Sequence, residues 1–382
     1  MDVRKRKRWG LIALLVVVVL IVGGIVGFRV AISVLKDRVV EALPPDSEIK
    51  NIRVGWSSVE VEGLRIKGPS GWPAVDALRA ERVTIVPSLR SILSKQYRVR
   101  AITIVKPYLS ALRTKGGRFL VVPGLLVGTA GEGQAAPAAA FPRVTIGHIT
   151  LQDGVVELFD ATVGEPPLKI RLEQVRVTVR NVVVPALKGK SWFELTGVVK
   201  GVQRDGHADV AGWVEVSTKD SSAKTQLRSV DLQVLQPYLI KAGETGVQKG
   251  TVDLDMQSDV RNNRLRAPGK MTISDLELVP AEGALGTFMG LPRRAVMAFL
   301  MKNENRITVD FVLEGDINDP QFSLNGAFTT RLAFGMAQVL GIDLGGMAKD
   351  VATLGQKGGE ATGQAAKGAG GWLWRLFKGK KK

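Results

Sequence analysis

A cluster of carboxylate and amide side chains in EGDINDPQFSL, residues 314–324, is the first place where chemistry could occur. Asp316 and Asn318 match positions 1 and 3 of a calcium-binding loop, which also needs an oxygen ligand at position 5, glycine at 6 and glutamate at 12. Those three positions hold Pro320, Gln321 and Ala327. Asp and Asn favour turns, and a proline withdraws a backbone donor from a strand ladder. The segment is therefore predicted to be a turn between two strands.

The remaining reactive residue types are few and scattered. The chain has two histidines, His148 and His207, and no cysteine, so disulfides, thiolate chemistry and cysteine-ligated zinc are excluded. Asp153, Glu157 and Asp160 surround a predicted hairpin, where two carboxylates could act as in a glycosidase, but the Asp-Gly dipeptide among them is a usual turn signal. No phosphate-loop, nucleophile-elbow or HExxH sequence occurs. We therefore expect no catalytic, metal or cofactor site, and an envelope hydrolase is disfavoured because no nucleophile–base pair can be assembled.

An apolar run without a charged side chain covers residues 9–28, directly after five basic residues within residues 1–8. Twenty helical residues cover about 30 Å, the thickness of the hydrocarbon core of a bilayer. The alternative is a cleaved signal peptide, whose apolar core is shorter, about 7–15 residues. We expect a transmembrane helix with a helical extension over residues 9–43. Because basic flanks stay in the cytoplasm, residues 1–8 are predicted to be cytoplasmic and the body periplasmic, anchored by a single pass in a bacterial inner membrane.

The net charge of +17 is concentrated at the two ends, with +4 in residues 1–8 and +5 in residues 372–382. This distribution favours contact with membrane surfaces over a basic body that binds nucleic acid. Indole rings prefer the headgroup level of a bilayer, and each nearby cation adds about 1 kcal/mol of attraction to an anionic surface. The candidate membrane-interface residues are Trp9, Trp372, Trp374, Phe377, Arg375 and Lys378. For the C-terminal tip, a partner-protein contact or a disordered solubilising tail remains the alternative.

Strict alternation of apolar and polar residues dominates the body of the chain and predicts β-strands with one apolar face. One-sided alternation is typical of antiparallel sheets, since parallel strands that are buried on both faces have continuous apolar runs. Only short helices are expected, at about residues 88–94, 233–241 and 293–302. The apolar positions of the clearest strands are Val175, Val177, Val179, Val252, Leu254, Met256, Ile307, Val309, Phe311 and Leu313.

Composition divides the chain, which at 382 residues is long enough for several domains. Residues 128–142 have almost no large side chains and are predicted to be a flexible linker. They separate a first β module, residues 44–127, from a second, residues 143–330. Residues 331–382 are rich in glycine and weakly amphipathic, so we expect a marginally helical tail that ends in the basic, aromatic tip.

Several long segments resemble the AsmA-like family of inner-membrane-anchored periplasmic proteins. They are ERVTIVPSLRSILSKQYRVRAITIVKPYLSALRTKGGRF, VTIGHITLQDGVVELFD, VDLQVLQPYLIKAGETGVQKGTVDLDMQ and LPRRAVMAFLMKNENRITVDFVLEGDINDPQFSLNG. The last segment contains the pattern G-x-(apolar)-x-D-P-x-F, which resembles an uncharacterised branch of the family. The resemblance covers the anchor and both modules. It implies a mainly β fold in which long antiparallel sheets curve into a groove, as in bridge-like lipid transfer proteins. It also implies a non-enzymatic role in binding or transferring phospholipid for the outer membrane.

What covers the apolar side of the sheets decides between two functions. In a closed β-sandwich a second sheet packs on that side, and the apolar residues are ordinary core. In an open groove acyl chains take the place of the second sheet, and burial contributes about 0.8 kcal/mol per methylene. Alternation is the same in both cases. With the resemblance we expect the groove, with the ten apolar positions named above as its floor and with phospholipid acyl chains, the inner membrane and other envelope proteins as partners. The alternative is a structural scaffold that assists outer-membrane protein assembly.

Overall fold

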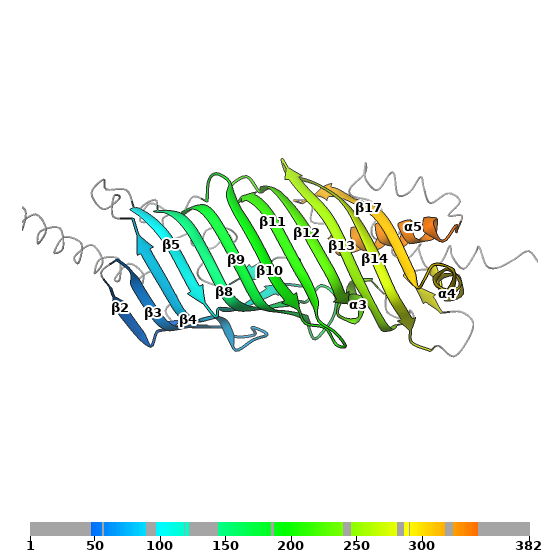
Figure 1. Ribbon diagram of the computed structural model, residues 1–382, viewed down its shortest axis with the longest axis horizontal. Coiled ribbons are helices and arrows are strands. Elements are labelled where there is room, and N and C mark those ends of the chain that lie inside the picture. Colours follow the sequence, from blue (N-terminus) through cyan, green and yellow to red (C-terminus); the bar gives the residue numbers. More distant parts are fainter. Residues whose placement is uncertain are drawn as a thin grey trace, which may run out of the picture.

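The computed structural model describes residues 47–55, 57–88, 97–117, 119–121, 144–184, 187–239, 246–280, 286–289, 291–317 and 324–342. These residues form a mainly β protein with few, short helices, as the alternation predicted. Figure 1 shows one long, twisted sheet that runs from β2 at one end to β17 at the other.

The strands of the N-terminal half are Ser47–Glu48 (β1), Asn51–Val54 (β2), Val59–Lys67 (β3), Asp76–Pro87 (β4), Tyr97–Val105 (β5), Tyr108–Arg113 (β6), Phe119–Val121 (β7), Val144–Asp160 (β8) and Leu168–Val184 (β9). Those of the C-terminal half are Ser191–Val199 (β10), Gly206–Glu215 (β11), Asp220–Asp231 (β12), Val247–Arg261 (β13), Arg264–Leu278 (β14), Thr287–Phe288 (β15), Leu291–Pro292 (β16) and Arg306–Asp316 (β17). β8 and β9 have 17 residues each, well above the usual strand length of about 3–10. Strands of this length make the sheet wide along the strand direction.

Fifteen strands belong to one sheet, in the order β1-β3-β4-β5-β8-β9-β10-β11-β12-β13-β14-β17, with β2, β6 and β7 attached at its N-terminal end. The two predicted modules therefore contribute to a single sheet. They are joined by β5 and β6, which follow one another along β4 and both pair with β8 in parallel. We expected antiparallel sheets, and the sheet is antiparallel apart from these two pairings.

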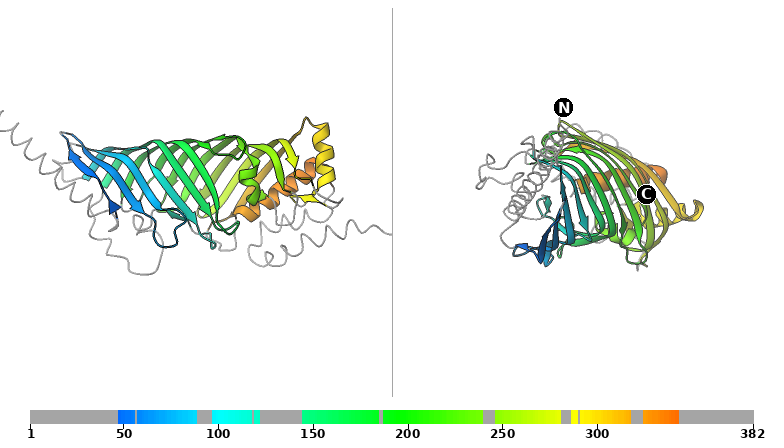
Figure 2. Two further views of the ribbon diagram at one scale, coloured as in Figure 1. Left: turned by 90° about the horizontal axis from the view of Figure 1, so that it is seen from below. Right: turned by 60° about the vertical axis from the view of Figure 1, so that its left-hand side comes forward.

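Irregular residues form a line across the sheet and bend it. Asp153 in β8, Gln174 in β9, Ser229 in β12 and Asp275 in β14 have positive φ angles of 55°, 51°, 52° and 53°. The strand register shifts beside each of the four. Such β-bulges bend a strand and increase its twist. The sheet accordingly curves into a trough, with two helices on its concave side (Figure 2).

The helices are α3 (Leu232–Leu239), α4 (Arg293–Lys302) and α5 (Leu324–Val339). The prediction for 293–302 is confirmed, and the one for 233–241 matches α3 within two residues. The third predicted helix, at 88–94, falls almost entirely outside the described residues.

The turn predicted after β17 lies largely outside the described residues, but the expectation that it leads into another strand is wrong, because the next described element is a helix, α5. In α5 the buried Leu332 and Met336 lie four residues apart, the spacing of one helix face rather than of a strand. The helix also begins before residue 331, where the helical tail was expected to start.

No helix among the described residues combines the length and apolar character needed to cross a membrane. The predicted transmembrane helix with its extension, residues 9–43, lies outside the described part of the chain, as do the basic tip at residues 1–8 and the linker at residues 128–142.

Candidate functional site: the apolar face of the sheet

Two rows of apolar side chains cross the sheet on one face. Residues directly opposite one another on paired strands share a face, so the pairing register identifies the members of each row. The first row consists of Val61, Val83, Ile104, Leu151, Val177, Leu195 and Val210. The second consists of Val59, Ile85, Ile102, Ile149, Val179 and Phe193. We call these thirteen residues the apolar floor.

The opposite face of the same strands is polar. Thr84, Thr103, Thr150 and Thr178 pair in register across β4, β5, β8 and β9, and the row continues to Glu194 in β10. Each of these residues adjoins a floor residue in the sequence and therefore points to the other side. The sheet thus has one apolar and one polar face, as the alternation predicted.

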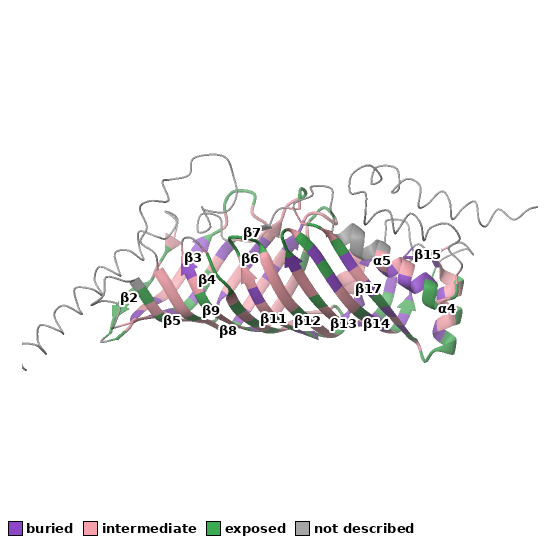
Figure 3. Cartoon of the chain, turned by 90° about the horizontal axis from the view of Figure 1, so that it is seen from above, coloured by how far each residue is buried: buried purple, intermediate pink, exposed green. Residues whose placement is uncertain are grey.

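Burial varies along the apolar floor. At its N-terminal end Val59 and Val61 in β3 are 0% and 2% exposed, and Val83 and Ile85 in β4 are also buried. Across β5 to β11 the floor residues are only half-buried, although they have the same chemistry. We call this part the central floor; it consists of Ile102, Ile104, Ile149, Leu151, Val177, Val179, Phe193, Leu195 and Val210. Figure 3 shows the intermediate burial of the middle strands.

At the C-terminal end the same face is covered by protein. Leu232 and Leu239 of α3, Val296 and Leu300 of α4, and Leu332 and Met336 of α5 belong to one hydrophobic cluster with the apolar residues of β13, β14 and β17. The cluster includes six of the predicted floor residues, Val252, Leu254, Ile307, Val309, Phe311 and Leu313, and Met256 packs against it. These seven are therefore part of a protein core, which corrects the prediction that they line a surface open to lipid.

The other predicted floor residues lie in β9. Val177 and Val179 are half-buried members of the central floor, with Leu195 and Phe193 opposite them in β10. Val175 is 0% exposed, next to the bulge at Gln174. Of the ten positions inferred from the sequence, Val177 and Val179 are the two that the structure places on the central floor.

A buried carboxylate fixes α3 to the far end of β8. Asp160 accepts hydrogen bonds from the Thr162 amide at 2.8 Å, the Thr162 hydroxyl at 2.6 Å and the Tyr238 hydroxyl of α3 at 2.9 Å. Arg113 Nη1 lies 3.2 Å from the same carboxylate. Burial opposes ionisation of Asp160, but the hydrogen bonds from Thr162 and Tyr238 outweigh it and lower its pKa. The ionised carboxylate therefore holds α3 against a strand 78 residues away in sequence.

The start of α3 is fixed by a second buried acid. Asp231 Oδ1 accepts a hydrogen bond from the Gln233 amide at 3.0 Å, which is the geometry of a helix N-cap. Its Oδ2 accepts from the amides of Val202 and Gln203 at 2.9 and 2.7 Å. Held at both ends, α3 places Leu235 against a small cluster on β10, β11 and β12. The helix thereby covers the floor side of the sheet near one rim.

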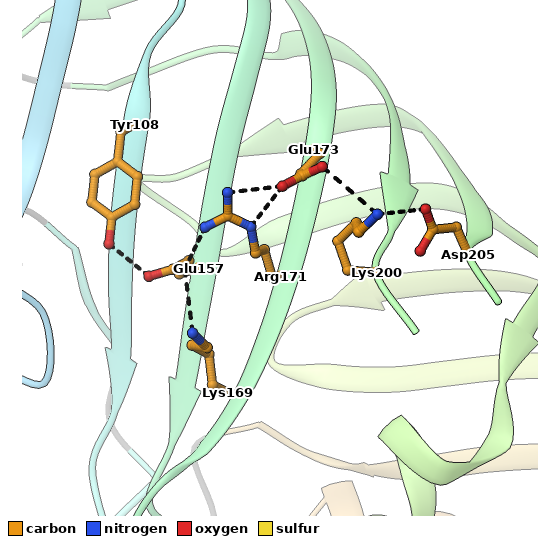
Figure 4. Close-up of polar contacts among 7 residues, drawn as sticks. All are labelled: Tyr108, Glu157, Lys169, Arg171, Glu173, Lys200 and Asp205. Atoms are coloured by element: carbon orange, nitrogen blue, oxygen red, sulfur yellow. Dashed lines mark hydrogen bonds and ion pairs between the residues drawn. The ribbon is translucent and has the colours of Figure 1, made fainter. Parts of the chain in front are cut away.

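The polar face carries a chain of charged side chains, shown in Figure 4. Its members are Tyr108, Glu157, Lys169, Arg171, Glu173, Lys200 and Asp205. Tyr108 donates to Glu157 at 2.7 Å, and Arg171 donates to the other Glu157 oxygen at 2.7 Å. Burial opposes ionisation of Glu157, but the hydrogen bonds from Tyr108 and Arg171 outweigh it and lower its pKa. The network links β6, β8, β9 and β10 where the two predicted modules join.

The residues considered for chemistry do not converge on one site. Glu157 is engaged on the polar face, Asp160 is engaged with α3, and Asp153 occupies the bulge of β8. His148 and His207 are exposed on different strands, and the described residues contain no group of His, Asp and Glu that could hold a metal ion. Asp316 ends β17, while the rest of its predicted turn, residues 318–323, lies outside the described part.

A cavity of about 580 Å³ opens beside the line of bulges. Part of its charged lining is paired: Arg65 Nε lies 2.6 Å from Asp76, and Lys106 lies 3.0 Å from Glu81. The guanidinium of Arg79 lies over the ring of Tyr108 at 4.8 Å. The lining carries charges of both signs, so the cavity indicates no particular class of ligand.

Seven of the nine central-floor residues were not among the floor positions predicted from the sequence. Ile102 and Ile104 alternate with Ala101 and Thr103 in β5, and this period of two could have identified them. Phe193 and Leu195 alternate in the same way in β10. What the alternation could not supply is the register that places these strands beside β9.

The candidate membrane-interface residues lie outside the described part of the chain. They are Trp9, Trp372, Trp374, Phe377, Arg375 and Lys378. No family model, no curated protein and no solved structure shows significant similarity to the chain. The apolar floor is therefore the basis for assigning a function.

Proposed function

We propose that the chain is a non-enzymatic envelope protein that binds or transfers phospholipid, with the acyl chains lying on the central floor. The observation that carries the proposal is the incompletely buried apolar surface that continues across β5, β8, β9, β10 and β11 on the concave side of one curved sheet. Contiguous apolar surface of this kind marks a binding site in soluble domains.

Acyl chains suit this surface better than a polar ligand. The central floor consists of aliphatic side chains and one phenylalanine, which offer no hydrogen-bond donor or acceptor. Moving a methylene from water onto such a surface gains about 0.8 kcal/mol, so a chain of many methylenes binds without any polar contact. The ligand's polar headgroup would remain in water beyond the floor.

The proposal contains no chemical step, in keeping with a sequence that has no cysteine and only two isolated histidines. The resemblance to AsmA-like proteins supports the same assignment, and the predicted anchor at residues 9–43 supports a periplasmic body held at the inner membrane. Lipid bound on the floor would then be supplied for biogenesis or maintenance of the outer membrane.

Site-specific photo-crosslinking of the full chain in its own cells tests the proposal. Phe193 on the central floor and Trp192 on the polar face are adjacent aromatic residues of β10, so benzoylphenylalanine at either position replaces one aromatic side chain with a larger one. In cells labelled with radioactive phosphate, irradiation is expected to yield phospholipid-labelled protein from Phe193→benzoylphenylalanine. The label from Trp192→benzoylphenylalanine is expected to be at least tenfold weaker. Val179 and Thr178 in β9 form a second pair with the same expectation.

Equal labelling on both faces would show only that lipid is nearby, and no labelling at Phe193 or Val179 would remove the proposal. In the latter case the structural scaffold becomes the better assignment. Its support is the closed hydrophobic cluster at the C-terminal end, which is the type of core that a scaffold needs. A protein-sized crosslinked product in place of lipid would then identify its partner.

A further inference from the structure

We infer that the lipid-holding part of the floor is a short compartment for a single diacyl lipid, with α5 as its end wall. This inference rests on the proposed function and deepens it, because it states where lipid binds and how much. It is based on the way in which both ends of the apolar face are buried while its middle is not.

The contact between α5 and β17 is too close to admit a ligand between them. Leu332 and Met336 of α5 are both 0% exposed, and Val309 of β17 is 1% exposed. A Cβ atom added to Gly335 would lie 2.3 Å from Val309 Cγ1, so only glycine permits this approach of helix to sheet. The helix therefore occupies the position over β17 that an acyl chain would need.

The two other helices complete the closed end. Val296 of α4 and Leu232 of α3 are both 0% exposed in the same cluster as Val252 and Ile307. The acids that hold α3, Asp231 at its start and Asp160 through Tyr238, are themselves buried. The apolar face of β13, β14 and β17 is thus packed against protein, with Met256 partly buried at its edge.

The remaining open stretch is about one lipid long. The central floor lies on five neighbouring strands, which at about 4.8 Å spacing span about 19 Å. One leaflet of the hydrocarbon core is about 15 Å thick, half of about 30 Å, so the chains of one lipid fit lengthwise. Two lipids end to end would need about 30 Å and would have to extend onto β12 and β13, where α3 packs. The two rows of the floor are about 7 Å apart along the strands, so the floor is narrow as well as short.

A compartment of this size acts as a carrier site rather than as a continuous path. A lipid enters and leaves through the same open stretch, because the C-terminal end is blocked by α5. The expected content of the purified full chain is therefore about one phospholipid per protein.

Aromatic probes at an open and a closed position of the face test this inference. Phe193 lies on the central floor and Phe311 in the closed cluster, so benzoylphenylalanine replaces a phenylalanine and adds a benzoyl group at each position. In the otherwise unchanged full chain, phospholipid labelling is expected at position 193 and at least tenfold less at 311. With Gly335→Leu, which forces α5 away from Val309, labelling at 311 is expected to rise towards that at 193.

The outcomes separate the inference from the proposed function. Labelling at 193 and 311 alike in the unchanged chain, or two or more phospholipids per protein by phosphate assay, would overturn the end wall and leave lipid binding intact. Labelling at neither position would overturn lipid binding itself. A folded Gly335→Leu chain with position 311 still unlabelled would also overturn the role of α5. If circular dichroism shows that this variant is unfolded, the comparison in the unchanged chain decides alone.

Discussion

Tyr238→Phe is the change that best tests how α3 is held on the sheet. The substitution removes only the hydroxyl that donates to Asp160 at 2.9 Å and keeps the ring. Asp160 is 1% exposed, so water does not readily replace the lost donor. The effect should therefore appear in α3 first, since the eight-residue helix has little stability of its own.

The magnitude depends on the partners that Asp160 keeps. A hydrogen bond to a charged group contributes about 1.5–3 kcal/mol. Because Thr162 still provides two donors and Arg113 still lies 3.2 Å away, the carboxylate is not left bare, and the lower value of about 1.5 kcal/mol applies. Since about 1.4 kcal/mol is a factor of ten, the equilibrium for local opening of α3 should rise about tenfold.

Amide hydrogen exchange of the full chain measures this opening directly. Protection of the α3 amides should fall about tenfold in Tyr238→Phe, while protection of β8 and β9 stays unchanged. Tyr108→Phe is the matched control, because Tyr108 also donates to a largely buried carboxylate, Glu157, but on the polar face. It should leave α3 protection as it is.

Two results would refute the proposed role of Asp160. Unchanged α3 protection in Tyr238→Phe would mean that the hydroxyl contact does not hold the helix. An equal loss in Tyr108→Phe would mean that exchange reports global stability and not the attachment of α3.

Two further predictions concern stability. The pKa of Asp160 is lowered in the folded chain, so the stability that its carboxylate contributes is present above about pH 4 and is lost as the pH falls through the folded pKa. In a melting series from about pH 7 to about pH 2, the melting temperature of Asp160→Asn should therefore decline less steeply with acid than that of the unchanged chain. A parallel decline of the two melting temperatures would contradict this. Gly212→Val in β11 should destabilise the fold by about 1–3 kcal/mol, because an added Cβ would lie 2.1 Å from the Ser222 carbonyl oxygen. This loss should appear as a lower denaturant midpoint. The control Ala211→Val, at an exposed position of the same strand, should change the denaturant midpoint little.

Much of the fold could be predicted from local pattern. The period of two places Val177 and Val179 on the face opposite Thr178, and the structure confirms this separation. The helix predicted at residues 293–302 has the same bounds in the structure, and its apolar residues have helical spacing. These successes share a cause: side-chain direction in a strand or helix depends on the residue's own position in the element.

Prediction of the candidate site failed where contact depends on distant segments. Ile307 and Val309 alternate as cleanly as Val177 and Val179, and only the docking of α5 and α3 makes them core. The turn after β17 was predicted to lead into another strand, because the proline and carboxylates end a strand without indicating the type of the next element. The amphipathic pattern of helix α5 is weak, and its position on the sheet depends on the close contact between Gly335 and Val309.

The amino-acid sequence by itself determined that the chain forms strands with one apolar and one polar side, because alternation specifies the face of every residue in a strand. It also determined that cysteine chemistry is absent. Only the tertiary structure decided that strands from both predicted modules share one sheet, and which apolar residues are covered. Those outcomes depend on register between strands and on the docking of helices against strands that are distant in the sequence, and no local pattern encodes either.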